Sequence, residues 1–113
     1  MRICIDVDGT ICFTKKDHES YADTTPIPGA IETIQKLKKQ GHYIIIATAR
    51  GMKTYHSNVG KITANQGTIL INWLDAHGVP YDEIWFGKPQ ADYYIDDKGV
   101  KFTDWKNVVD EIS

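Results

Sequence analysis

Two short runs of mainly β-branched residues, 2–7 and 42–48, most constrain what this chain can fold into. Each run ends in polar residues, which is typical of buried parallel strands that stop at a loop. Between them, residues 28–40 begin with proline, carry apolar residues at helical spacing and are followed by glycine, so they predict one amphipathic helix. A strand, helix and strand in succession predict a right-handed crossover in a parallel sheet.

The rest of the chain continues this alternation. Residues 69–77 predict a second helix, residues 83–86 and 92–95 predict two short strands, and Asp104 is expected to cap a last helix. The polar segments 10–26 and 50–65 are expected to be loops. We therefore predict a single α/β domain over residues 1–113, a Rossmann-like three-layer sandwich with a mostly parallel central sheet.

Composition excludes several classes of protein. Charged residues make up 25% of the chain, and its net charge of −2 with interleaved signs leaves no basic stripe for nucleic acid. Asp6 and Asp8 interrupt the first apolar run before it could act as a signal-peptide core, so a cytoplasmic protein without a membrane partner is expected. Cys4 and Cys12 are expected to be free thiols, because one lies within a strand and the other in the loop that follows.

Polar side chains stand at the ends of three predicted strands. They are Asp6 and Asp8, Thr48, and the pair Asp96 and Asp97. Because ligands of open parallel sheets bind at the carboxyl ends of the strands, we expect these groups to converge. So much negative charge would repel a phosphate unless a hard cation bridged it, and Mg²⁺ fits carboxylate ligands of this kind.

The first of these strand ends offers two carboxylates in separate roles. Asp6 and Asp8 are two residues apart and should project to the same side, so that one can attack while the other handles protons. Gly9 permits a tight turn, and the amides after it could donate to anionic oxygens. Thr48 and Lys88 could each contact a phosphoryl oxygen.

These residues resemble the motifs of the haloacid dehalogenase superfamily of phosphatases. The matching residues are Asp6-Val7-Asp8-Gly9-Thr10, Thr48, Lys88 before Pro89, and Asp96-Asp97. The resemblance implies that Asp6 forms an aspartyl-phosphate and that Asp8 acts as acid and then as base. It also implies Mg²⁺ held by Asp6, the Val7 carbonyl and Asp96, with Asp97 direct or through water. The predicted catalytic residues are Asp6, Asp8, Thr48 and Lys88; the predicted metal ligands are Asp6, Asp8, Asp96 and Asp97.

Residues 48–54 and 81–89 are further similar to small phosphatases of this superfamily from capsule and surface-polysaccharide synthesis. That similarity implies a sugar phosphate or related intermediate as substrate. The chain lacks the long insert of relatives with a large cap domain, so specificity would come from its two loops or from a neighbouring subunit. Only five residues separate Phe86 from Asp92, too few for a crossover helix, so a loop must make that return.

Substrate contacts are expected in the turn after the first strand and in the loop after Thr48. Arg50 is the strongest candidate, because a guanidinium fork suits carboxylate or phosphate. The full predicted set is Gly9, Thr10, Ala49, Arg50 and Lys53. Two alternatives stay open: a phosphotransferase using the same aspartyl-phosphate, and a receiver-like signalling domain that accepts phosphate without turnover.

Overall fold

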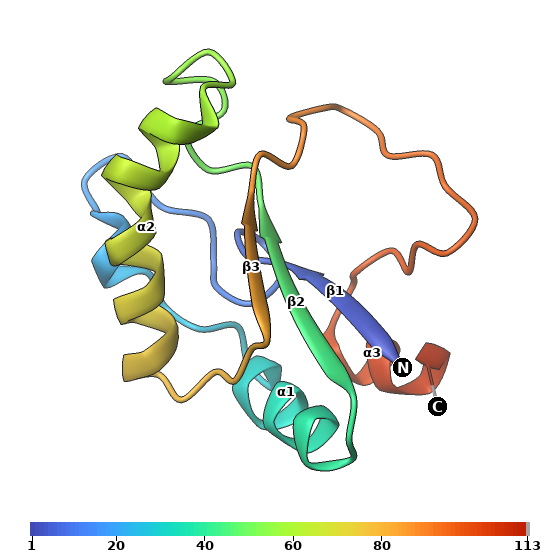
Figure 1. The fold of residues 1–113 in the computed structure, drawn as a ribbon. Coiled ribbons are helices and arrows are strands. Elements are labelled where there is room, and N and C mark those ends of the chain that lie inside the picture. Colours follow the sequence, from blue (N-terminus) through green and yellow to red (C-terminus); the bar gives the residue numbers. More distant parts are fainter. Residues whose placement is uncertain (113) are drawn as a thin grey trace.

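The protein, seen in a computed structural model that describes residues 1–112, is built around a three-stranded parallel sheet. The strands β1 (Arg2–Asp6), β2 (Tyr43–Thr48) and β3 (Glu83–Phe86) lie side by side in that order (Figure 1). The helices are α1 (Ala30–Lys39), α2 (Val59–Ala76) and α3 (Trp105–Ile112), with a short 3-10 helix η1 (Tyr21–Asp23). The predicted α/β fold with a parallel sheet is confirmed.

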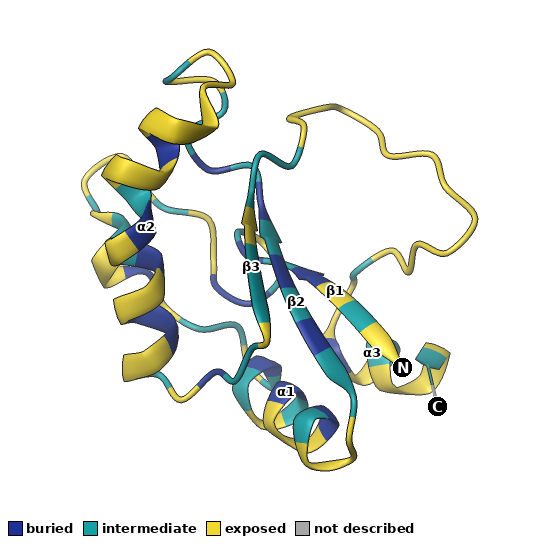
Figure 2. Cartoon of the chain, in the orientation of Figure 1, coloured by how far each residue is buried: buried dark blue, intermediate teal, exposed yellow. Residues whose placement is uncertain are grey.

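Strand alternation divides the side chains between two different faces. In β2, Ile44 and Ile46 are fully buried and join a core to which α1, α2 and α3 all contribute. The opposite face includes Cys4, Ile45 and Trp85, none of which belongs to that core, and it carries an open groove of about 350 Å³. Figure 2 shows the buried residues gathered where the helices meet the sheet. One face of the sheet therefore holds the fold together while the other is accessible.

The residues just before α1 and α3 determine where these two helices begin. α1 starts at Ala30, two residues later than predicted from Pro28, because Gly29 occupies the N-cap in the left-handed region. The carboxylate of Asp104 accepts the Asn107 amide at 2.7 Å, which confirms the predicted cap of α3.

The start of α2 was predicted too late. Residues 59–65 were expected to be loop, whereas the helix begins at Val59. The side chain of Asn58 caps it by accepting the Lys61 amide at 3.0 Å, which satisfies one of the free donors of the first turn. The predicted loop 50–65 therefore ends at residue 58.

The strand predicted at residues 92–95 does not form. These residues lie in an exposed loop, where Tyr93 and Ile95 are 86% and 97% exposed, and β1 has no neighbour on its outer edge within residues 1–112. A parallel strand beyond β1 would begin at the opposite edge of the sheet from the end of β3. To reach that point the chain would have to pass across β2 and β1 and back along their length, a distance of roughly 17 Å. The six Cα steps from Phe86 to Asp92 span at most about 21 Å. So short a connection leaves little slack for a path over the strand ends.

The state of the two thiols was predicted from the sequence. Cys4 and Cys12 are both free, as predicted. Within residues 1–112 no helix is long and apolar enough to cross a membrane.

Candidate active site

Asp6 and Lys88 meet at the carboxyl edge of the sheet. Asp6 is the last residue of β1, and its Oδ1 lies 3.6 Å from Nζ of Lys88; the two side chains are 34% and 28% exposed. The Lys88 amide donates to the Thr48 carbonyl at 3.2 Å, so the ends of β2 and β3 fix the start of the loop that carries Lys88. The structure thus brings together an accessible carboxylate and a cation at the place where strand ends were predicted to converge.

The turn after β1 is closed by its own hydrogen bonds. The Val7 carbonyl accepts the amides of Thr10, Ile11 and Cys12 at 3.1, 2.8 and 3.2 Å. Gly9 has φ +82°, which explains why this turn requires glycine. The Val7 carbonyl was expected to bind metal, but it is occupied by these three donors. The amides of residues 10–12 are equally engaged, so in this arrangement they do not form the predicted anion-binding nest.

Asp8 is held by Arg50 instead of facing open solvent beside Asp6. Nε and Nη2 of Arg50 each donate to one oxygen of the Asp8 carboxylate at 3.0 Å. The Arg50 side chain is fully buried, whereas that of Asp8 is 27% exposed. Arg50 was expected to contact substrate, but its guanidinium is enclosed and its fork is taken by Asp8.

Two further side chains, Tyr21 and Cys12, complete this cluster. The Tyr21 ring lies under the Arg50 guanidinium, 4.2 Å from ring centre to Cζ, and Sγ of Cys12 lies 3.6 Å from the Asp8 carboxylate. No spacing rule links Tyr21 to Arg50, so the sequence does not predict this contact. An aromatic residue in the loop after Gly9 was the only signal available.

Thr48 acts as a structural link in this arrangement. Its side chain is fully buried, and its Oγ1 accepts the Arg50 amide at 3.1 Å. The Ala49 carbonyl accepts the amide of Met52 at 3.1 Å, and Lys53 lies exposed in the turn that follows. The structure therefore buries Thr48 beneath the turn that carries Arg50, while Lys53 is exposed and, within residues 1–112, makes no hydrogen bond or ion pair with Asp6, Asp8 or Lys88.

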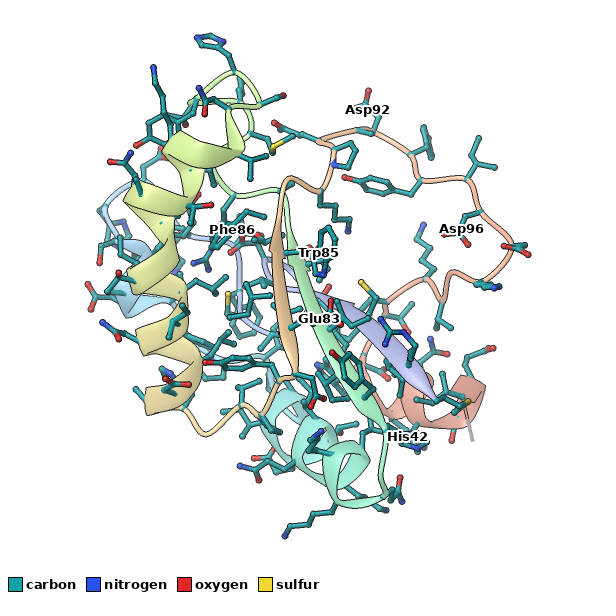
Figure 3. All side chains as sticks on the ribbon, viewed as in Figure 1. His42, Glu83, Trp85, Phe86, Asp92 and Asp96 are labelled. Carbon is teal, nitrogen blue, oxygen red and sulfur yellow. The ribbon has the colours of Figure 1, made fainter. Side chains whose placement is uncertain are left out.

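Asp96 and Asp97 do not approach Asp6. Both are exposed in the loop after Lys88, and the Asp96 carboxylate accepts the Gly99 amide at 2.9 Å. Figure 3 shows Asp96 on the part of that loop that bows away from the sheet. Within residues 1–112 no three acidic, histidine or cysteine side chains lie close enough to hold a metal ion. The carboxylates present are of the type that Mg²⁺ prefers, but in this arrangement they do not fit one ion.

The environment of the thiols removes them as competing nucleophiles. Burial, and next the negative charge of Asp8, raise the pKa of Cys12 to about 11. Cys4 is exposed, yet partial desolvation still raises its pKa, although the charge of Lys88 opposes this. Because a thiol reacts as its thiolate, neither cysteine is activated at neutral pH.

Comparison with known proteins relates this chain to one family of hydrolases. Residues 3–73 match the family model for haloacid dehalogenase-like hydrolases. Over 89 residues, covering 75% of this chain, the sequence is 36% identical to a protein of Chlorobaculum tepidum whose name, 5′(3′)-deoxyribonucleotidase, is provisional. The aligned region is 41% of that relative, so the chain corresponds to less than half of its length.

Two solved structures share the fold. A crystal structure of a protein from Vibrio cholerae has 40% sequence identity and a TM-score of 0.82, covering 88% of this chain and 82% of that one. A D,D-heptose 1,7-bisphosphate phosphatase from B. bronchiseptica, complexed with magnesium and phosphate, has a TM-score of 0.51 and 18% identity, covering 75% of this chain and 48% of that one. The second likeness concerns the fold alone.

Proposed function

The chain belongs to the haloacid dehalogenase-like hydrolase family, and from this premise we propose that it hydrolyses a small phosphomonoester with Asp6 as the nucleophile. The observation that carries the proposal is the accessible Asp6 carboxylate at the end of β1, 3.6 Å from the ammonium group of Lys88. A carboxylate can attack phosphorus, and a neighbouring cation stabilises the charge on the phosphoryl oxygens.

The proposed reaction has two steps. An Asp6 oxygen forms a bond to phosphorus while the ester P–O bond breaks, and protonated Asp8 gives its proton to the leaving oxygen. Water then attacks the aspartyl-phosphate, Asp8 takes a proton from that water, and the Asp6 O–P bond breaks to release inorganic phosphate. Lys88 holds the phosphoryl group in both steps. Asp8 regains the protonated form for the next cycle with the proton that it took from water.

Mg²⁺ is part of the proposal as a cofactor. Its support is the chemistry of the acidic residues and the magnesium bound to the B. bronchiseptica phosphatase of similar fold. A bound divalent ion would offset the charge of substrate and carboxylates. Since Asp96 and Asp97 lie apart from Asp6 in this arrangement, we assign no step to the ion, and its requirement is tested by chelation.

The proposed substrate is a sugar phosphate or a related intermediate, in line with the motif resemblance of residues 48–54 and 81–89. The name of the C. tepidum relative adds deoxyribonucleotides to the compounds worth testing. Since residues 1–112 form no large cap over the strand ends, we propose that the exposed loops, or a second copy of the chain laid across them, select the substrate.

The test is a phosphate-release screen over sugar phosphates, deoxyribonucleotides and phosphorylated small acids, with Mg²⁺ and with EDTA. We expect turnover that EDTA abolishes and that Asp6→Asn lowers by about three orders of magnitude or more. Asp110→Asn, a change at an exposed carboxylate of α3, is the matched control and should keep native turnover. Native turnover by Asp6→Asn would exclude Asp6 as the nucleophile.

The same assay separates the two alternatives. A phosphotransferase would give phosphorylated product when acceptor alcohols are added. A receiver-like domain would take up one phosphoryl group per chain from a small phosphodonor and release none on the timescale of turnover.

A further inference from the structure

We propose that Arg50 is a positioning residue that fixes the orientation of the Asp8 carboxyl group, so that its protonated form can give a proton to the leaving group and its carboxylate form can then take one from water. The inference rests on the proposed function, because it assigns Asp8 the role of acid and base. It replaces the expectation that Arg50 contacts substrate.

The contact between the two residues is specific in geometry. Two nitrogens of one guanidinium donate to the two oxygens of one carboxylate, both at 3.0 Å. A bidentate pair of this kind fixes the plane of the carboxylate as well as its position. A carboxylate held at one point could rotate, whereas Asp8 held by the fork cannot rotate without breaking a charged hydrogen bond.

Arg50 is itself held from several directions. Its amide donates to Thr48 Oγ1 at 3.1 Å, and its guanidinium lies over the Tyr21 ring. With the side chain fully buried, it has no open face toward a ligand. The fork is thus fixed before substrate arrives, which is what a group that orients a catalytic acid requires.

One nitrogen of Arg50 makes the arrangement costly. Nη1 is buried and has no hydrogen-bond partner within residues 1–112. Burying a charged group with an unmet donor is unfavourable. The pair with Asp8 therefore explains why an arginine lies here. A lysine or a hydrophobic residue could fill the same space, but neither would donate two hydrogen bonds to the Asp8 carboxylate.

Asp8 keeps the capacity to act while it is held. A carboxylate offers about four acceptor sites; Arg50 takes two, the Cys12 thiol lies 3.6 Å from Oδ1, and the Asp8 side chain is still 27% exposed. The open part of the carboxylate can face the leaving oxygen. Loss of the fork would let it move, and a displacement of about 1 Å can cost roughly 100-fold in rate.

The kinetic test compares two leaving groups in Arg50→Lys, which keeps the charge but not the fork. An alkyl phosphate needs its leaving oxygen protonated, whereas p-nitrophenyl phosphate does not. We expect kcat/KM for the alkyl phosphate to fall about 100-fold and that for p-nitrophenyl phosphate to fall less than about threefold. Arg2→Lys is the matched control, since Arg2 is the other arginine and its side chain is 64% exposed; it should change neither value.

Each other result has a distinct meaning. An equal fall for both esters, a rise in KM with unchanged kcat, or no change at all would overturn the role of Arg50. Absence of turnover in the native protein would overturn the proposed function instead. A thermal melt of each variant shows whether the fold is retained.

A spectroscopic arm tests the pair without activity. With only two arginines in the chain, the ¹⁵N spectrum contains two Nε–H signals, and Arg2→Lys identifies which belongs to Arg50. We expect a shifted, slowly exchanging Arg50 signal in the native protein that returns to a free, rapidly exchanging one in Asp8→Asn. A rapidly exchanging Arg50 signal in the native protein would overturn the proposal even if Arg50→Lys failed to fold.

Discussion

Gly51 approaches Ile62 so closely that a single methyl group placed there would test the packing beside Arg50. A Cβ at Gly51 would lie 3.0 Å from Cγ1 and 3.2 Å from Cγ2 of Ile62, and 3.2 Å from Cδ2 of Tyr55. Ile62 is fully buried, so it has little room to move away. Gly51 also has φ +76°, a conformation that alanine adopts only with strain.

The expected cost of Gly51→Ala has two parts. The left-handed backbone costs alanine roughly 1–2 kcal/mol, and overpacking of a filled core adds roughly 1–3 kcal/mol. Gly41→Ala isolates the first part, because Gly41 has φ +92° and a Cβ added there would meet no atom within 4 Å. We therefore expect Gly51→Ala to lower the free energy of unfolding by about 1–3 kcal/mol more than Gly41→Ala.

Urea unfolding of the two variants measures this difference, and a double-mutant cycle with Ile62→Ala assigns it. Removing both Cγ atoms of Ile62 should relieve the clash, so the double variant should be less destabilised than the sum of the single variants by about 1–3 kcal/mol. Equal losses for Gly51→Ala and Gly41→Ala, or a purely additive cycle, would refute the close approach.

Three further predictions concern pH, a helix cap and the thiols. The hydrogen bond from Lys38 keeps the pKa of Asp82 below its ordinary value. The contribution of Asp82 to stability is therefore present above the unfolded pKa of about 3.9 and is lost as pH falls. Urea midpoints between pH 6 and 3 should fall more steeply for the native protein than for Asp82→Asn. Asp104→Ala should lower the free energy of unfolding by about 1 kcal/mol, while Asp104→Asn, which keeps a capping oxygen, should cost less. A thiol reagent at pH 8 should modify exposed Cys4 in the native protein, but buried Cys12, with its pKa raised to about 11, only after unfolding.

The sequence was sufficient to predict the strand ends that carry Asp6, Thr48 and Lys88. Short β-branched runs set the strands, and parallel strands place their carboxyl ends at one edge whatever the details of packing. The meeting of Asp6 with Lys88 at 3.6 Å follows from that geometry. The cap of α3 was also predictable, because a side-chain cap depends on residues close in sequence.

Other features depend on contacts that no local pattern encodes. Arg50 lies 42 positions from Asp8, and whether a guanidinium faces solvent or a carboxylate is decided by the packing of three separate segments. The placement of residues 92–95 depends on the length of the connection after β3, which competes with the gain from pairing to β1. The early start of α2 was missed because residues 59–65 offer only Val59 and Ile62 as larger apolar residues, although Asn58 supplies a cap.

The stack of Tyr21, Arg50 and Asp8 links three segments that are distant in the sequence. A change in any one alters the surroundings of the other two, since the ring supports the guanidinium and the guanidinium holds the carboxylate. In evolutionary terms these positions should therefore vary together. Relatives that replace Arg50 should also lack an aromatic residue at the position of Tyr21, and they would need another donor to orient the carboxylate at position 8.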